Sequence, residues 1–385
     1  MRREWKNAPL GELCTVCAGG TPSRAKPEYW DGDTPWVKIS DMLQGTITAT
    51  DERITRLGLE NSAAKLLPPG TLLLSIFATI GRTAVLGIEA ATNQAIVGLS
   101  VRDHNQLDLD FLRRFLELKT VELEGRARGV AQANINGAIL KAVRIPLPPL
   151  AEQRRIAEVL DRAEALRAKR RAALAQLDSL TQSLFLDLFG NPAENPKKWR
   201  MCAVGEIADC IVPGRDKPKS FTGDVPWITT DDLRHLEVTS SSPKKLGLSA
   251  AEIAEVRARV IPEGSVIISC VGDLGIVSLA GADLVINQQL HSFQCHENVD
   301  NLFLMHCLAF QEAFMYAKAS STTLPYMNKT VCNSIPVVVP PIPLQREFAR
   351  RVTAVEALKT THRASLAELD ALFAALQHRA FRGEL

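Results

Sequence analysis

The sequence contains one long internal repeat, in which residues of the first half recur 191 to 194 positions later. The segment that starts at Pro35-Trp36 recurs at Pro226-Trp227, and the pair Asn93-Gln94 recurs as Asn287-Gln288. A repeat of this length indicates a duplicated domain, because solenoid repeats have periods of roughly 20–50 residues. The chain is therefore expected to present two similar surfaces that can bind two similar but non-identical targets.

Length and composition limit the class of protein. A chain of 385 residues is expected to form two or more domains of roughly 100–200 residues each. The net charge is only +2, so any binding of nucleic acid must depend on local basic surfaces. Met1 is not followed by a secretory signal, and the apolar runs are shorter than the roughly 18 residues that span a bilayer. We expect a cytoplasmic protein that does not enter the membrane.

Short β-rich segments separated by glycine and proline predict two mixed α+β domains, at residues 1–147 and 191–339. In the first domain we expect strands at Trp36–Ile39, Thr71–Phe77, Ala95–Val101 and Ala142–Leu147, and a helix at Leu109–Glu124. The second domain repeats this order, with strands at Val225–Thr229 and Ser265–Val271 and a helix at about Leu302–Ala317.

Two long helices are expected after these domains, in the segments 148–190 and 340–385. Residues 151–189 contain no glycine or proline and are rich in good helix formers. At about 1.5 Å per residue, such a helix is roughly 55–60 Å long, a length typical of coiled coils. Steps of three and four residues give one apolar seam on each helix. The first seam is predicted to contain Ile156, Val159, Ala163, Leu166, Arg170, Ala173, Leu177, Leu180 and Leu184. The second is predicted to contain Phe348, Arg351, Val355, Leu358, His362, Ser365, Leu369, Leu372 and Leu376.

Both seams contain a basic residue at the same place, Arg170 in the first helix and His362 in the second. The two helices can bury their seams against each other, and an antiparallel pairing would bring the two midpoints close together. A polar seam residue can select one alignment at a cost in stability. The alternative is that both residues are partly exposed and have no role in specificity.

Replacing Arg170 and His362 by leucine tests the register hypothesis. Without the two polar residues, the coiled coil is expected to become more stable and to lose its single alignment. Light scattering measures the oligomeric state, and engineered disulfides between the helices report the alignment. An unchanged oligomeric state and helix alignment would show that the two residues do not set the register.

The sequence lacks the common catalytic motifs, including those of nucleotide-binding loops, zinc proteases and serine hydrolases. Cys14 and Cys17 form a CxxC pair, but further zinc ligands at matching spacing are not evident, so buried apolar positions are the favoured interpretation. Asp231-Asp232 could bind a metal, but the counterpart is Ser40-Asp41, and a role in a loop or helix cap is favoured. Asn191-Pro192 is interpreted as the end of a helix.

Polar loops recur at equivalent places in the two halves, and their side chains are of the types that contact bases and phosphates. Recurrence in both halves favours recognition over the alternative of merely solvated loops. For the first half, the candidate DNA-binding residues are Thr21, Ser23, Arg24, Lys26, Arg126, Arg128, Gln132 and Asn134. For the second half, they are Arg215, Lys217, Lys219, Ser321, Thr322, Tyr326 and Asn328.

Taken together, the order of motifs, their duplication and the two long helices resemble the specificity subunit of type I restriction–modification systems, over essentially the whole chain. The features that carry the resemblance are Trp5, Leu10-Gly11-Glu12, Gly19-Gly20-Thr21-Pro22-Ser23, Pro35-Trp36, Gly70–Ser75, Thr79-Ile80-Gly81-Arg82, Asn93-Gln94 and Ile145–Ile156. The second half departs from this pattern, with Pro213-Gly214-Arg215-Asp216 in place of the Gly-Gly-Thr-Pro-Ser turn. DNA contacts therefore cannot be transferred from one half to the other.

The resemblance implies two target-recognition domains that each read half of a bipartite, asymmetric DNA site. It implies that the helices set the spacing of the half-sites and dock two methyltransferase subunits. Those partners would carry S-adenosylmethionine, and a restriction and motor subunit would use ATP and Mg²⁺, so this chain would hold no cofactor and no catalytic activity. At about 3.4 Å per base pair, the helix length limits the separation of the readers to roughly 17 base pairs.

Two other classes of function are kept open. A coiled-coil scaffold that binds proteins through its globular domains would show no salt-dependent affinity for DNA. A single-chain methyltransferase or nuclease would be active without partners, and the missing cofactor and metal motifs argue against it.

Overall fold

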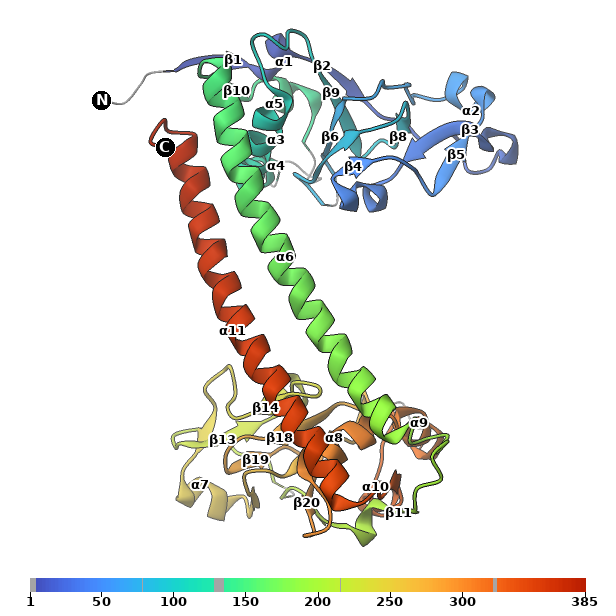
Figure 1. Ribbon diagram of the computed structural model, residues 1–385, viewed down its shortest axis with the longest axis vertical. Helices are drawn as coiled ribbons and strands as arrows, with labels where there is room; N and C mark the ends of the chain where they lie inside the picture. Colours follow the sequence, from blue (N-terminus) through green and yellow to red (C-terminus); the bar gives the residue numbers. More distant parts are fainter. Residues whose placement is uncertain (1–4, 78, 128–134, 215, 321–323) are drawn as a thin grey trace. The chain divides into compact units, whose positions relative to one another are not determined.

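The computed structural model describes residues 5–77, 79–127, 135–214, 216–320 and 324–385. The chain divides into two compact units (Figure 1). Unit 1 contains Met1–Arg171 and Ser365–Leu385, and unit 2 contains Ala172–Ala364. Each unit therefore holds one globular region, the first part of one long helix and the last part of the other.

The globular region of unit 1 is built on three small sheets. The largest has the spatial order β2 (Cys14–Ala18), β9 (Ile96–Val101), β6 (Leu72–Ser75), β7 (Thr83–Leu86) and β4 (Thr46–Ile47). The second has the order β5 (Glu52–Ile54), β3 (Trp30–Val37) and β8 (Ala91–Thr92), and the third pairs β1 (Lys6–Pro9) with β10 (Arg144–Leu147). β4 is parallel to β7, and the other neighbours in the largest sheet are antiparallel.

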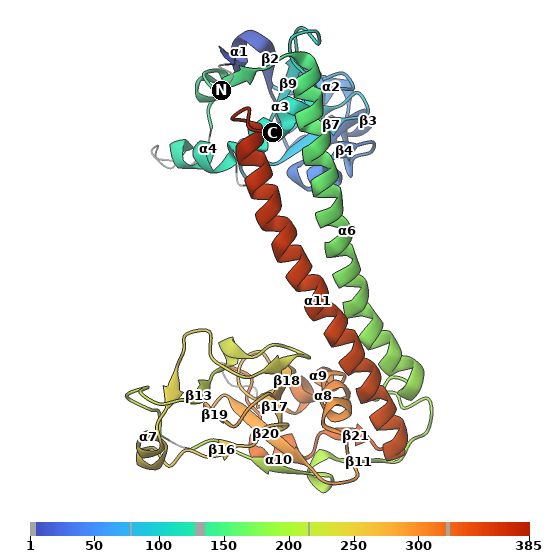
Figure 2. The ribbon, with the colours of Figure 1, turned by 60° about the vertical axis from the view of Figure 1, so that its left-hand side comes forward.

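Unit 2 repeats this topology (Figure 2). Its largest sheet has the order β12 (Ala208–Ile211), β20 (Leu290–Cys295), β17 (Val266–Ser269), β18 (Val277–Ala280) and β14 (Val238–Thr239). A second sheet contains β15 (Gly247–Leu248), β13 (Val225–Ile228), β19 (Leu284–Ile286) and β16 (Val260–Ile261), and β11 (Met201–Ala203) pairs with β21 (Pro336–Val338). The predicted duplication of a mixed α+β domain is confirmed.

The central strand of each large sheet is apolar at successive positions because both of its faces are covered. Leu72 and Leu74 of β6 belong to one buried cluster, and Leu73 belongs to another on the opposite face. In unit 2, Val266 and Ile268 point to one cluster and Ile267 to the other. Strands buried on both faces have continuous apolar sequences rather than alternating ones. This explains the apolar runs that the two halves share.

The predicted helix of each globular region is divided in two. Unit 1 has α3 (Leu109–Leu118) and α4 (Thr120–Ala127), and unit 2 has α8 (Asn301–Ala309) and α9 (Glu312–Lys318). The break occurs where Thr120 packs against Gly81 in unit 1 and where Glu312 packs against Gly275 in unit 2. Both glycines have positive φ, 85° and 86°, which other residues rarely adopt. The remaining short helices are α1 (Leu10–Leu13), α2 (Arg56–Glu60), α5 (Gly137–Lys141), α7 (Ala250–Glu255) and α10 (Lys329–Asn333).

The two long helices are α6 (Leu150–Phe189) and α11 (Ile342–Ala380). They run antiparallel in each unit, as the ion pairs between them show. Arg167 Nε lies 2.6 Å from Asp370 Oδ1 in unit 1, and Lys359 Nζ lies 2.9 Å from Asp178 Oδ1 in unit 2. Among the helices of the described ranges, these two included, none combines the length and apolarity needed to cross a membrane.

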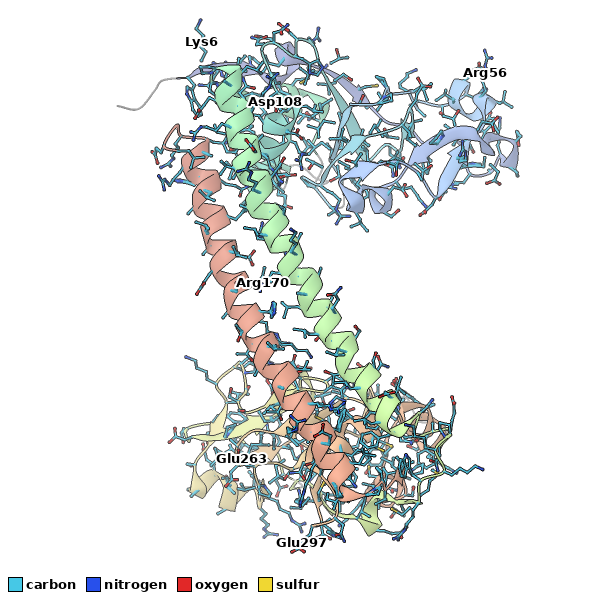
Figure 3. The ribbon with its side chains drawn as sticks, viewed as in Figure 1. Lys6, Arg56, Asp108, Arg170, Glu263 and Glu297 are labelled. Atoms are coloured by element: carbon cyan, nitrogen blue, oxygen red, sulfur yellow. The ribbon has the colours of Figure 1, made fainter. Side chains whose placement is uncertain are left out.

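Burial along the long helices follows most of the predicted seam. Ile156 and Phe348 are fully buried, and Val355 is also buried. The predicted seam residues that are partly buried are Val159, Ala163, Arg170, Ala173, Leu177, Leu184, His362, Ser365, Leu369 and Leu376. Arg170 lies near the middle of α6 (Figure 3), and its role in the register with His362 stays a prediction.

The prediction is wrong at five positions that are exposed: Leu166, Leu180, Arg351, Leu358 and Leu372. Leu166 is 54% exposed and Leu358 is 52% exposed. The inward residues are their neighbours Arg167 and Lys359, whose side chains make the ion pairs between the helices. The guanidinium of Arg167 also lies over the ring of Phe373, at 4.3 Å from its centroid. Long basic side chains can bury their apolar stems while their charged ends stay paired. A pattern of apolar residues alone therefore selects Leu166 and Leu358 in place of the neighbours that point inward.

A buried glutamine joins the start of each long helix to its globular region. Gln153 donates hydrogen bonds to the carbonyls of Gln106 and Pro148, both at 2.9 Å, and accepts one from the amide of Asp108 at 2.9 Å. Asp108, which caps the start of α3, is labelled in Figure 3. Gln345 makes the same three contacts in unit 2, with the carbonyls of Asn298 and Pro340 and the amide of Asp300. Both side chains are fully buried.

Replacing Gln153 by leucine is expected to destabilise unit 1 by about 2–4 kcal/mol, because one buried amide and two carbonyls lose their partner. Urea denaturation followed by circular dichroism measures this loss. Lys169→Leu is the control, since Lys169 is exposed on the part of the same helix that belongs to unit 1. Equal stabilities of the two variants would contradict the role of Gln153.

Candidate nucleic-acid interface

Four loops of unit 1 meet at one edge of the large sheet, and we call this place, and its equivalent in unit 2, the loop edge. They contain residues 18–26, 76–81, 92–95 and 135–136. Backbone hydrogen bonds join them in series: Gly20 N to Thr92 O at 2.8 Å, Ile76 N to Ala95 O at 2.9 Å, and Ile135 N to Ile76 O at 3.1 Å. The predicted glycine-rich loop and the loop before the last strand are thus held together through two loops between them.

The same connections recur in unit 2. Cys270 N donates to Gln289 O at 2.8 Å, and Met327 N donates to Cys270 O at 2.9 Å. Gln288 Nε2 donates to Gly214 O at 3.1 Å, which ties the first loop to this set. The duplicated Asn-Gln pair therefore has a structural function in both units. In unit 1 its glutamine, Gln94, accepts a hydrogen bond from the Thr21 hydroxyl.

The glycines of the first loop are required by close backbone packing. A Cβ on Gly19 would collide with the backbone of Thr92 and Asn93, and one on Gly20 would collide with that of Ala63 and Ala64. The carbonyl of Gly20 also accepts a hydrogen bond from the buried indole of a tryptophan on β3 at 3.0 Å. The loop is consequently fixed on the sheets, and its exposed side chains have defined positions.

Arg24 of this loop is held by two contacts. Its guanidinium lies 3.6 Å from the centroid of the Trp30 ring and 2.6 Å from Glu52 Oε2, and its side chain is 57% exposed. Glu52 also accepts a hydrogen bond from Lys38 Nζ at 2.9 Å, and this bond and Arg24 hold the pKa of Glu52 below its ordinary value. A guanidinium has five N–H donors, so Arg24 can contact DNA while it stays bound to Glu52.

The other two predicted residues of the loop are exposed. Ser23 accepts a hydrogen bond from the Trp30 indole through its carbonyl at 3.1 Å, which leaves the hydroxyl at the surface. Lys26 Nζ donates to the Tyr29 hydroxyl at 2.9 Å, and this bond raises the pKa of Lys26. Both residues are available for contacts with phosphate or base.

In unit 2, a glutamate that the sequence analysis missed holds the loop of Lys217 and Lys219, which are both exposed. Glu252 Oε1 accepts hydrogen bonds from the Ser220 hydroxyl at 2.5 Å and from the Thr222 amide at 3.2 Å. These bonds, together with those from the Ser249 amide and hydroxyl, lower the pKa of Glu252 to about 2. The sequence signal was present, because Ser249 and Glu252 have the spacing of a helix capping box.

The loop before α10 of unit 2 also contains predicted residues. Tyr326 is 44% exposed, and its carbonyl accepts a hydrogen bond from the Ser320 amide at 3.0 Å. The side-chain oxygen of Asn328 caps α10 by accepting from the Val331 amide at 3.0 Å, which leaves its NH2 group available for a contact with DNA. Asn136 caps α5 in the same way at 2.9 Å.

Some predicted residues cannot be placed. Six lie outside the described ranges: Arg128, Gln132, Asn134, Arg215, Ser321 and Thr322. Arg126 belongs to α4, but its side chain is not described.

A cavity that no sequence pattern predicted lies at the loop edge of unit 1. It has a volume of about 470 Å³ and is lined in part by Phe77, Gln94, Asn136 and Lys141. Phe77 is half-exposed. An apolar ring beside amide groups can contact both the methyl group of thymine and polar base edges. No sequence pattern indicated Phe77, because its loop becomes part of this edge only through the hydrogen bonds of Ile76.

Two smaller predictions are settled by the geometry. Asp232 is buried and accepts hydrogen bonds from the amide and hydroxyl of Thr229, both at 2.8 Å, so its cap role is confirmed. Cys14 is buried, and this burial raises the pKa of its thiol to about 12. A buried thiol of this kind behaves as a small apolar side chain.

Comparison with known proteins identifies this architecture. The family model described as "Type I restriction modification DNA specificity domain" matches residues 2–176 and 196–371, one copy for each half. The chain belongs to this family. The MjaIX specificity subunit of Methanocaldococcus jannaschii is 23% identical over 376 residues, which cover 90% of this chain and 85% of that protein. The EcoR124I/EcoR124II specificity subunit of Escherichia coli is 29% identical over 170 residues, covering 42% of this chain and 41% of the relative.

Solved structures agree with the fold of this specificity-family member. A chain from a study of type I restriction–modification complex assembly and conformational transition has a TM-score of 0.61 at 21% identity, with 99% of this chain and 98% of that chain covered. The S subunit from M. genitalium has a TM-score of 0.60 at 15% identity, with 98% and 96% covered.

The low pKa of Glu252 makes the stability of unit 2 depend on pH. A carboxyl group whose pKa is lowered by folding stabilises the folded state above its ordinary pKa of 4.5, and this contribution is lost as the pH falls through about 2. The Glu252→Gln variant is therefore expected to be less stable than the wild type at pH 6, with the difference shrinking towards pH 2. Urea midpoints across this range measure it.

Glu255→Gln controls for the loss of one negative charge from the same helix. If both variants gave the same pH profile, the anchoring role of Glu252 would be wrong.

Proposed function

We propose that this chain is the DNA sequence-recognition subunit of a type I restriction–modification complex, in which each unit reads one half of a bipartite, asymmetric site. The observation that carries the proposal is that the loop edges of the two units are built alike but differ in their exposed side chains. Both units join equivalent loops, two of the links being the same backbone hydrogen bonds. They present different side chains there, such as Arg24 and Lys26 in one and Lys217 and Lys219 in the other. A shared framework with different contact residues is expected of two readers of different sequences.

The long helices are proposed to set the half-site spacing and to dock two methyltransferase subunits. Within each unit the helices are paired by ion pairs and buried side chains, which gives them the stiffness that a spacer needs. Leucines that lie outside the buried seam remain half-exposed on them: Leu166, Leu180, Leu358 and Leu372. These leucines are proposed as contact points for the methyltransferase subunits.

Catalysis is proposed to lie on the partner subunits. The methyltransferase subunits would bind S-adenosylmethionine, and a restriction and motor subunit would bind ATP and Mg²⁺. This chain would contribute sequence recognition and geometry alone. The names of the relatives as specificity subunits support this division of tasks.

DNA binding by the chain together with its methyltransferase partner tests the proposal. The double variant Lys217→Ala, Lys219→Ala is expected to bind all sequences more weakly and to reduce the slope of log K against log salt by about 1.8, since each phosphate contact contributes about 0.9. Fluorescence anisotropy at several salt concentrations measures both.

The matched control is Lys6→Ala, which removes an exposed lysine of β1 outside the loop edge (Figure 3). DNA affinity that does not depend on salt would favour the protein-binding scaffold instead.

A further inference from the structure

Unit 2 contains a cavity of about 480 Å³ between its parts of the long helices, α8 and the loop before β14. This volume is within the range of pockets that hold small organic ligands, about 300–1,000 Å³. The residues that matter for its chemistry are Thr181, His235, Glu237, His306, Phe310 and Lys359. None of them belongs to the loop edge described above.

Two buried polar atoms in the wall of this cavity have no hydrogen-bond partner among the described residues. They are Thr181 Oγ1 and His306 Nε2. Thr181 is 5% exposed and His306 is 3% exposed. A buried polar atom without a partner costs about 1–3 kcal/mol, so a molecule that bonds both atoms would gain binding energy. Burial lowers the pKa of His306 to about 4, so its imidazole is neutral at pH 7.

Comparison with unit 1 shows which side-chain groups the cavity of unit 2 lacks. Three residues of unit 2 are smaller than their counterparts 192 positions away in unit 1: Thr181 for Phe373, His306 for Arg114, and Ala309 for Glu117. In unit 1, Phe373 is buried beneath the guanidinium of Arg167. Arg114 bonds Asp161 at 2.6 Å and Glu117 at 2.8 Å. Unit 1 thus fills this position with an aromatic ring and a planar, hydrogen-bonded guanidinium.

The ion pairs that surround the cavity of unit 2 have counterparts in unit 1. Lys359 pairs with Asp178 at 2.9 Å and with Glu356 at 2.6 Å. Its counterpart in unit 1, 192 residues earlier, is Arg167, which pairs with the corresponding aspartate and glutamate. The cavity therefore results from smaller side chains, because the ion pairs between the long helices are the same in both units. It is not a sign of looser packing between the helices.

Unit 2 also adds groups suited to a ligand. The ring of Phe310, where unit 1 has a leucine, lines the cavity. His235 Nδ1 accepts a hydrogen bond from the Val277 amide at 3.3 Å, so its proton is on Nε2. The cations are already neutralised, because Lys359 has its two carboxylates and Arg363 pairs with Glu237 at 2.6 Å. The lining holds three carboxylates, those of Asp178, Glu237 and Glu356, against these two cations, so a ligand without a negative charge fits it.

We propose that this cavity binds a neutral, planar nitrogen heterocycle of purine size. Its ring takes the place that the Phe373 ring has in unit 1 and packs beside Phe310. Its ring nitrogens or amino group form hydrogen bonds with Thr181 Oγ1 and His306 Nε2. Aromatic contacts of this kind favour flat rings, and nitrogen heterocycles supply both donors and acceptors at their edges.

Titration of the full-length chain with adenosine tests the proposal, by calorimetry and by the shift of the melting temperature. Saturable one-to-one binding is expected at concentrations up to about 1 mM. The Thr181→Phe variant restores the residue of unit 1 and is expected to abolish binding while the chain stays folded. Ser183→Phe, at an exposed position of the same helix outside the cavity lining, is the matched control and should bind as the wild type does.

A second variant, His306→Leu, keeps the proposal testable if Thr181→Phe fails to fold. It removes one hydrogen bond and should weaken adenosine binding about tenfold. The proposal is overturned if adenosine shows no saturable binding, which would mean that water alone occupies the cavity. It is equally overturned if adenosine binds Thr181→Phe, or His306→Leu, as tightly as the wild type.

Discussion

The buried glutamine at the start of each long helix is the contact on which the rest of the structure depends. Gln153 and Gln345 each satisfy one amide and two carbonyls that would otherwise be buried without partners. These bonds fix the direction in which each helix leaves its globular region. A helix can act as a spacer only if this junction is rigid. A flexible junction would let the globular region that recognises DNA take many positions on it.

The duplication also explains how each globular region is completed by the far end of the other helix. Phe381, near the end of the chain, packs against Phe111 and Phe115 with ring centroids 5.3 Å apart. Phe189, at the end of α6, packs against Phe303 at 4.8 Å. Each unit therefore contains the start of one helix and the end of the other, and both helix ends are part of a hydrophobic core.

Much of the fold could be predicted from the sequence because its signals are local and occur twice. The apolar strands around Leu73 and Ile267 and the glycine-free helices are of this kind. The seam was predicted only in part, since steps of three and four residues fit Leu166 as well as Arg167. The choice depends on Asp370, an ion-pair partner on the other helix that periodicity does not reveal.

The candidate site was predictable at the level of loops and not of contacts. The two loops proposed for each half do meet, but the link between them consists of backbone hydrogen bonds such as that from Ile76 to Ala95. Side-chain identity says little about such bonds, so Phe77 and Glu252 were overlooked. Arg24 was chosen for its charge, and its packing on Trp30 became visible only in three dimensions.

The most direct test of the central claim, that each unit reads one half-site, is methylation-sensitive sequencing of a genome that expresses this chain with an active methyltransferase partner. The account predicts a gapped, two-part adenine-methylation motif that disappears when the gene for this chain is deleted. A methylation pattern that stays the same after deletion, with the partner still active, would contradict it.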